Sequence, residues 1–256
     1  MFQNDYRGGG FRSLFSDIPP VTKNLLLVNI FIYFLMSLIP GAEAALERWC
    51  ALYYFSSPGF YAYQLFTYMF LHGSFMHLFF NLFALWMFGR IIERSMGSAR
   101  FLFFYLTCGI GAALVQEGVF AIYIHRIASL LPPEVVRQTI HEGWIHIQHN
   151  QNYIDPDLGQ LNALVNSPMV GASGAIYGVL LAFGYLFPNQ PIYLYFLMPI
   201  KAKWFVIGYG ILELVYGVGG SADGVAHFAH LGGMIFGFFL LWYWKRKGVF
   251  NNHWFF

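Results

Sequence analysis

The sequence has few charged residues and few cysteines. Only 10% of its 256 residues are charged, whereas about a quarter of a typical soluble domain is charged. So few polar groups cannot cover a globule in water, which excludes an ordinary soluble domain and predicts that lipid is the solvent. The 2 cysteines, Cys50 and Cys108, offer no disulfide framework, and we interpret them as buried or interfacial thiols. A net charge of +2, without clustered basic residues, excludes a nucleic-acid-binding groove.

The beginning of the chain lacks the pattern of a cleavable signal peptide. Its first stretch, MFQNDYRGGGFRSLFSDIPP, is polar and rich in glycine, and the apolar run begins only after Lys23. We therefore expect this first apolar run to be an uncleaved membrane span.

Apolar and aromatic side chains are abundant, at 58% and 21% of the chain. A helix needs roughly 20 apolar residues to cross about 30 Å of hydrocarbon. Six segments meet or approach this requirement, and we expect an all-α polytopic membrane protein with six transmembrane helices. The predicted spans are about 22–40, 74–92, 99–118, 171–188, 202–218 and 225–244.

The basic residues predict how these spans are oriented. If the N-terminus is cytoplasmic, only Arg48, Arg126 and Arg137 of the 14 lysines and arginines fall in outer segments. This asymmetry follows the positive-inside rule and predicts that both termini are cytoplasmic. The expected organisation is a cytoplasmic segment 1–21, a membrane domain 22–245 and a cytoplasmic tail 246–256.

Two of the predicted outer segments are large. Residues 41–73 are aromatic but interrupted by acidic residues, proline and glycine, which predicts a loop with short helices lying in the membrane interface. Residues 119–168 are more polar, and the stretch from Pro133 to about Gln148 predicts an amphipathic surface helix.

A few polar side chains lie inside the predicted spans. Because such groups are costly in a membrane, each of them is a functional hypothesis. His77, Ser173 and His230 fall within about two turns of the outer ends of three different spans, at a common depth. We interpret Glu213 as a residue that caps or pairs locally near the outer end of its span, and we assign it no catalytic role. The polar residues of the spans are His77, Asn81, Ser173, Glu213, His227 and His230.

The convergent residues fit the chemistry of acyl transfer. A serine hydroxyl needs a base to take its proton, and histidine is the usual base. His77, Asn81 and the Ser173 N–H could donate hydrogen bonds to the developing oxyanion. No carboxylate is evident to orient His230, so a serine–histidine dyad is the minimal prediction. Two non-catalytic alternatives remain. Ser173 could hydrogen-bond to its own backbone, and His77 and Asn81 could form hydrogen bonds that link helices.

Paired glycines predict how the fourth and sixth spans approach each other. Gly174 and Gly178 are four residues apart, as are Gly233 and Gly237. Small residues at this spacing let membrane helices pack backbone to backbone. If the two spans cross at these glycines, Ser173 and His230 come within hydrogen-bonding reach; otherwise the pairs are packing seams alone.

Other chemistries fit the sequence less well. The string from His141 to His146 is one residue longer than H-E-x-x-H, so its two histidines face apart on a helix. His227 and His230 could share a metal, but no third ligand is evident, and we expect no metal. An α/β-hydrolase elbow requires glycine where Ala175 stands, after a strand. A small transporter or a non-catalytic scaffold remains the alternative, although the chain has no two-fold repeat.

Three motifs together resemble the rhomboid family of intramembrane serine proteases. They are HGSFMHLFFN in the second predicted span, GASGAIYG in the fourth and AHFAHLGGMIFG in the sixth, within a six-span body of about 22–245. The resemblance implies that Ser173 is the nucleophile and His230 its base. It also implies that His77, Asn81 and the Ser173 N–H form the oxyanion hole. Further supporting positions are Tyr177, which packs on the catalytic histidine, and Gly171, Gly174, His227, Gly233 and Gly237.

The resemblance also implies an activity and a location. The expected activity is cleavage, without a cofactor, of single-span or other membrane proteins in or next to their transmembrane segments. The expected location is the bacterial inner membrane. Apart from the resemblance, the glycines of the fifth span and the loop 219–226 suggest the hypothesis that these segments act as a movable gate and cap. Where the family has a Trp–Arg pair in the first outer loop, this chain has Tyr63-Gln64. A non-catalytic family member that binds membrane proteins is the alternative.

Overall fold

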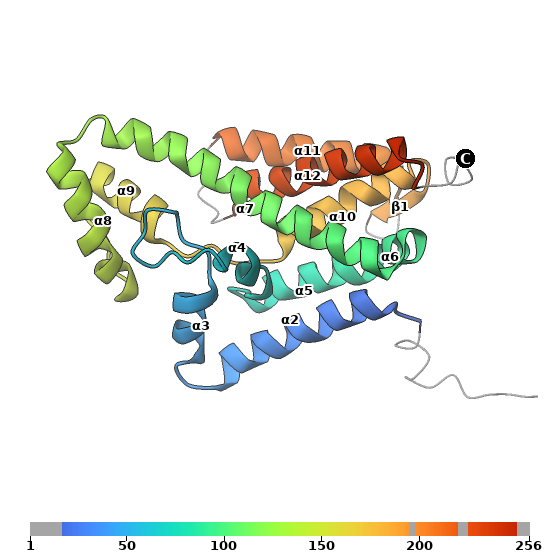
Figure 1. Ribbon diagram of the computed structural model, residues 1–256, viewed down its shortest axis with the longest axis horizontal. Coiled ribbons are helices and arrows are strands. Elements are labelled where there is room, and N and C mark those ends of the chain that lie inside the picture. Colours follow the sequence, from blue (N-terminus) through green and yellow to red (C-terminus); the bar gives the residue numbers. More distant parts are fainter. Residues whose placement is uncertain (1–16, 195–197, 220–224, 250–256) are drawn as a thin grey trace, which may run out of the picture.

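The computed structural model describes residues 17–194, 198–219 and 225–249, and this part of the chain is mainly helical (Figure 1). A π-helical turn, η2, joins α5 and α6 into one continuous helix over Phe75–Met96. The helices in chain order are α2 (Pro20–Leu38), α3 (Ala42–Cys50), α4 (Gln64–Thr67), η1 (Tyr68–Phe70), α5 (Phe75–Ala84), η2 (Leu85–Gly89), α6 (Arg90–Met96), α7 (Ser98–Ala128), α8 (Pro133–Gln148), α9 (Pro156–Asn166), α10 (Ser173–Leu186), α11 (Ala202–Gly219) and α12 (His227–Arg246).

The six predicted spans correspond to α2, α5–α6, α7, α10, α11 and α12. In the described part of the chain, Pro20–Leu38, Phe75–Met96 and Ser98–Ala128 are long and apolar enough by length and composition to cross a membrane, and α10 is a shorter apolar helix. The chain therefore forms a helical membrane bundle, as expected. The predicted gate loop 219–226 lies mostly outside the described residues, because 220–224 are not among them.

The third predicted span is much longer than expected. The predicted span of about 99–118 ends just after Gln116 and Glu117, but α7 continues to Ala128. Both polar side chains are buried, and each accepts a hydrogen bond from a distant segment. Gln116 Oε1 accepts from the Ala229 N–H at 3.1 Å, and Glu117 Oε2 accepts from the Phe55 N–H at 3.2 Å. Because both groups are satisfied, they do not interrupt the helix.

Helix α10 is the most enclosed of the spans, and α7 and α12 pack against it. Its glycines allow this approach: a Cβ added to Gly178 would stand 2.4 Å from Cys108 Sγ on α7. A Cβ added to Gly233 on α12 would stand 1.8 Å from the Gly174 carbonyl oxygen. The backbones of α10 and α12 therefore touch at the glycines that the sequence pairs.

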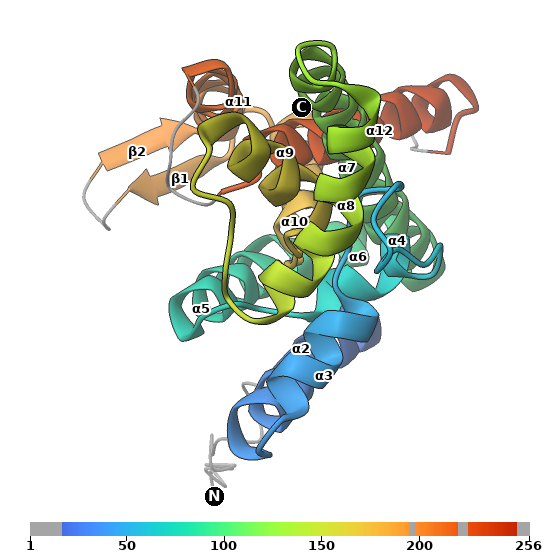
Figure 2. The ribbon, with the colours of Figure 1, turned by 90° about the vertical axis from the view of Figure 1, so that its left-hand side faces the viewer.

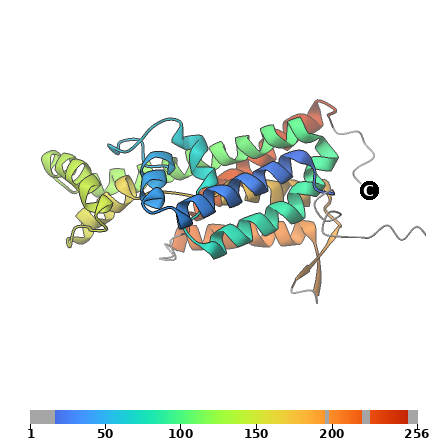
Figure 3. The same cartoon turned by 90° about the horizontal axis from the view of Figure 1, so that it is seen from below.

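A short antiparallel hairpin departs from the all-α prediction. Strands β1 (Pro191–Leu194) and β2 (Met198–Lys201) pair with Pro191 opposite Lys201, and they connect α10 to α11. Proline is tolerated at the first position of β1, and the apolar and aromatic residues that follow favour an extended chain. The hairpin lies at the opposite end of the bundle from α8 and α9 (Figures 1 and 3).

The helices of the two outer segments lie at one end of the bundle, which faces the viewer in Figure 2. Helices α3, α4 and η1 match the short helices expected in 41–73, and α8 matches the surface helix expected from Pro133 to Gln148. Ser57 donates to Asn166 Oδ1 at 2.7 Å, and Asn166 donates to the Ile140 carbonyl at 2.9 Å. These bonds tie the first outer loop to α8 and α9.

Gln64 organises the first outer loop from its interior. This side chain is fully buried; its Nε2 donates to the Gly59 carbonyl at 2.9 Å, and its Oε1 accepts from the Tyr61 N–H at 3.1 Å. An uncharged residue, Gln64, therefore anchors this loop.

Candidate active site

Ser173 is the first residue of α10, and a fixed extended segment leads into it. Met169 pairs with Leu52 of the first outer loop through two backbone hydrogen bonds of 2.8 and 3.0 Å. Gly171 has φ +131°, a conformation that only glycine adopts without strain, and its N–H donates to the Tyr68 carbonyl at 3.0 Å. The Ser173 N–H therefore stands at a helix N-terminus, where backbone donors lack intrahelical partners and the helix dipole is positive.

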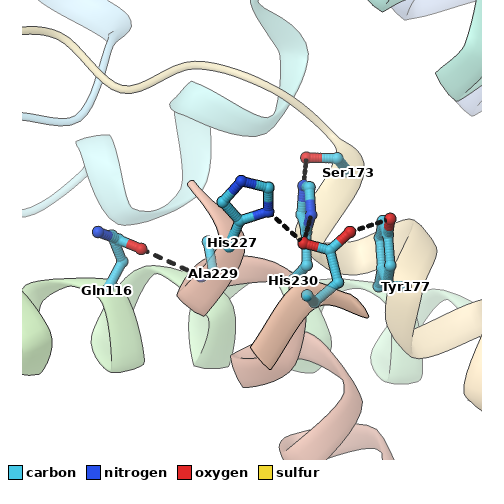
Figure 4. Close-up of polar contacts among 7 residues, drawn as sticks. Gln116, Ser173, Tyr177, His227, Ala229 and His230 are labelled. Carbon is cyan, nitrogen blue, oxygen red and sulfur yellow. Dashed lines mark hydrogen bonds and ion pairs between the residues drawn. The ribbon is translucent and has the colours of Figure 1, made fainter. Parts of the chain in front are cut away.

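His230 lies in the first turn of α12 and faces this serine. Its Nε2 is 2.8 Å from Ser173 Oγ, although the two residues are 57 positions apart in sequence (Figure 4). His230 is 7% exposed, whereas Ser173 is half-buried, so the base is shielded while the hydroxyl remains partly accessible. The touching glycines of α10 and α12 lie next to this contact and set the separation of the two helices.

Tyr177 lies one turn after Ser173 on α10 and supports the imidazole. Its ring stacks on His230 with centroids 4.2 Å apart and an interplanar angle of 5°. The structure thus brings Tyr177 to the place expected from the resemblance. The tyrosine hydroxyl in turn donates a short hydrogen bond to Glu213 Oε1.

Glu213 corrects one of our expectations. We interpreted it as a local cap on the fifth span without a part in the site, but it is buried and points into the site from α11. Its Oε2 is 2.7 Å from His227 Nδ1 and 2.9 Å from His230 Nδ1. Ala202, Val206 and Glu213 are the buried residues of α11, and they share one helix face. This periodicity, together with the rarity of carboxylates inside spans, is the signal that could have identified it.

His77 and Asn81, the side chains predicted to donate hydrogen bonds to the oxyanion, lie on α5. They are four residues apart and share one face of the helix. The Ser74 hydroxyl caps this helix by accepting from the His77 N–H at 3.1 Å. A Cβ added to Gly171 would lie 2.8 Å from His77 Nε2 and 3.7 Å from Ser173 Oγ, so both side chains border the same glycine. Asn81 is buried, and its Nδ2 donates to no acceptor in the described part of the chain. A buried donor that has no partner in the protein is available to donate a hydrogen bond to a substrate oxygen.

His72 is a neighbour of the site that the sequence analysis left out. It lies in the loop before α5, and its ring makes an edge-on contact with His77 at a centroid distance of 5.1 Å. Burial lowers the pKa of His72 to about 3, with the nearby His77 as the second cause, so its ring is neutral. The histidine that opens the motif HGSFMHLFFN therefore packs behind the predicted oxyanion donor.

Three side chains able to bind a metal converge here, which corrects our statement that no third ligand accompanies His227 and His230. Glu213 is that third group, and the ligand atoms of the three lie within 4.8 Å of one another. The imidazole nitrogens stand 2.7 and 2.9 Å from one carboxylate oxygen. Ligands of a tetrahedral zinc with bonds of about 2.0–2.1 Å stand roughly 3.3 Å apart. The distances therefore fit N–H groups that face a carboxylate better than a set of metal ligands.

The fold and the site define a polytopic helical membrane protein in which a serine and a histidine on two spans meet. A family model described as the rhomboid domain matches residues 60–123 and 150–247, which is more than half of the chain. The chain belongs to the rhomboid family.

Individual relatives have modest identity to this chain. Rhomboid protein 1, mitochondrial, of Saccharomyces cerevisiae is 27% identical over 245 residues, covering 90% of this chain and 58% of that protein. Rhomboid protease GlpG of Klebsiella pneumoniae is 29% identical over 107 residues, which are 42% of this chain and 38% of that protein. Rhomboid protease GlpG of Salmonella newport is 30% identical over 98 residues, covering 38% and 35%. The chain thus spans less than two thirds of the length of each relative.

Proposed function

We propose that this protein is an intramembrane serine endopeptidase that cleaves peptide bonds in or next to the transmembrane segments of other membrane proteins. The observation that carries the proposal is the 2.8 Å contact between His230 Nε2 and Ser173 Oγ inside a helical membrane bundle. Membership of the rhomboid family, which includes relatives named as proteases, supports the same activity.

The proposed mechanism is acyl transfer through Ser173. His230 Nε2 takes the hydroxyl proton as Ser173 Oγ attacks the scissile carbonyl carbon, and it then gives that proton to the leaving amine. The negative oxygen of the tetrahedral intermediate accepts hydrogen bonds from the Ser173 N–H, His77 and Asn81. Water then hydrolyses the acyl-enzyme by the same route, with His230 again acting as base. We propose no metal or cofactor in this sequence of steps.

A serine-directed fluorophosphonate probe tests the nucleophile directly. We expect the probe to label the wild-type protein in detergent at one site, Ser173. A serine hydroxyl displaces fluoride from the phosphorus of the probe only when a neighbouring base activates that hydroxyl. Mass spectrometry of the labelled peptide identifies the residue. Labelling of another serine, or equal labelling of the Ser173→Ala variant, would contradict the proposal.

The oxyanion-hole assignment predicts a graded loss of activity. We expect Asn81→Ala and His77→Ala each to lower kcat by about 100-fold, as expected when one donor to a tetrahedral intermediate is lost. The unfolding midpoint of Asn81→Ala should stay near the wild-type value, because Nδ2 donates to no described acceptor. Cleavage kinetics with a single-span substrate check the first point and thermal melting the second. Full activity of both variants would show that His77 and Asn81 are not part of the oxyanion hole.

The location and organisation of the protein are also proposals. The relatives named above come from a mitochondrion and from bacteria. We propose a bacterial inner-membrane location with both termini cytoplasmic, supported by the distribution of lysine and arginine. The proposed membrane domain is 22–245, flanked by the segments 1–21 and 246–256, and the family match from 60 to 247 falls largely within it.

A further inference from the structure

A carboxylate lies behind the histidine of the Ser173–His230 pair. Glu213 is 7% exposed, and both of its oxygens face polar groups of other helices. Oε1 accepts from the Tyr177 hydroxyl on α10. Oε2 stands 2.7 Å from His227 Nδ1 and 2.9 Å from His230 Nδ1, both on α12. One hydroxyl and two imidazole nitrogens therefore surround one buried carboxylate, and polar neighbours of this kind offset the cost of its desolvation.

This placement decides which imidazole nitrogen carries the proton. A carboxylate only accepts hydrogen bonds, so the tautomer with a proton on His230 Nδ1 is favoured where that nitrogen faces Glu213. The lone pair is then on Nε2, which faces the Ser173 hydroxyl at 2.8 Å. The favoured tautomer is the one that can accept the serine proton.

The contact with His230 is close without being a well-formed hydrogen bond. Among the described residues, His230 Nδ1 makes no regular hydrogen bond, and Glu213 Oε2 is its polar neighbour at 2.9 Å. Hydrogen bonds of active sites are often poorly aligned without substrate and tighten in the complex. His227 and Tyr177 contact the carboxylate from two sides and hold it beside the His230 ring.

We infer that Glu213 is a positioning residue, which turns the Ser173–His230 pair into a serine–histidine–glutamate triad. Its carboxylate holds the His230 ring with Nε2 toward the serine and stabilises the imidazolium that forms when the serine proton arrives. The inference rests on the proposed peptidase function. It assigns His227 and Tyr177 the task of orienting the carboxylate.

The competing explanation is structural: Glu213 would only tie α11 to α10 and α12. The two explanations differ in what an isosteric amide does. The Gln side chain keeps the size and one acceptor oxygen, so α11 can stay in place. Its NH₂ group, turned toward Nδ1, instead favours the wrong tautomer of His230.

The test compares Glu213→Gln with Glu117→Gln in the full chain. Glu117 is a matched control because it is also a buried glutamate, held by the Phe55 N–H outside the site. We expect Glu213→Gln to lower kcat by about 100-fold, with KM and the unfolding midpoint close to wild type. Glu213→Asp, which restores the charge on a shorter side chain, should recover about tenfold of that loss and leave kcat about tenfold below wild type. Glu117→Gln should keep the wild-type kcat.

Two results would overturn the inference. One is a kcat for folded Glu213→Gln within threefold of wild type. The other is a loss of activity that Glu213→Asp does not reverse and that parallels a lower unfolding midpoint. If Glu213→Gln does not fold, Glu213→Asp decides alone: a tenfold lower kcat at unchanged KM supports the role, and an unchanged kcat rejects it.

The proposed function has its own separate readout. If Ser173→Ala cleaves the substrate as well as wild type, the peptidase mechanism itself fails, whatever Glu213 does. If Ser173→Ala is inactive and Glu213→Gln is fully active, the dyad stands and only the inference about Glu213 fails.

Discussion

Ser173→Ala and His230→Ala are each expected to abolish cleavage of a single-span substrate in liposomes. The first removes the nucleophile, and the second removes the group 2.8 Å away that accepts its proton. Because the two residues act as one unit, the double variant should be no less active than either single variant. We expect a loss of at least about 1,000-fold in kcat for all three proteins, measured by gel quantification of the cleaved substrate.

Two controls separate this result from loss of fold and from metal chemistry. The helical circular dichroism of the variants should match that of wild type, since the glycine contacts that hold α10 against α12 are left intact. EDTA should leave wild-type turnover unchanged. Cleavage by either single variant at more than a tenth of the wild-type rate would contradict the proposed mechanism of acyl transfer through Ser173 and His230.

Gly233→Ala is expected to have the second-largest effect, through the distance between α10 and α12. The added Cβ would stand 1.8 Å from the Gly174 carbonyl oxygen, so the two backbones must move apart. Overpacking of this kind costs about 1–3 kcal/mol. A shift of about 1 Å between reacting groups lowers the rate by about 100-fold. We therefore expect both a lower unfolding midpoint and a kcat reduced by at least that factor.

Gly118→Ala is the matched control for this prediction. Gly118 lies within α7, and an added Cβ there would have no atom within 4 Å. Alanine is favoured over glycine inside a helix by roughly 1 kcal/mol, so this variant should be as stable as wild type or more so, with full activity. Equal behaviour of the two variants in thermal melting and cleavage would contradict the proposed role of the backbone contact.

The sequence predicted the spans and the approach of the serine to the histidine because both follow from position along helices. Ser173 and His230 occur near matching ends of their spans, and the glycines after them allow close packing. The roles of these residues remain proposals. Their proximity, however, is present in the structure, where His230 Nε2 lies 2.8 Å from Ser173 Oγ.

What the sequence did not predict depends on contacts between distant segments. The end of α7 was misplaced because Gln116 and Glu117 suggest a polar boundary until their partners Ala229 and Phe55 are known. Glu213 was misinterpreted because the rotation of α11 about its axis is set by packing against α10 and α12. The hairpin was missed because two strands of 4 residues each carry little periodicity.

Helix α11 carries Glu213 inward while its other side is exposed, with Val215 at 59% and Val218 at 70%. Any outward tilt of α11 therefore withdraws one carboxylate from His227, His230 and Tyr177 at the same time. Such a tilt would leave the His230 ring without the carboxylate that now stands 2.9 Å from its Nδ1. If α11 is the proposed gate, the movement that opens the bundle would also loosen the imidazole, and turnover could proceed no faster than α11 returns.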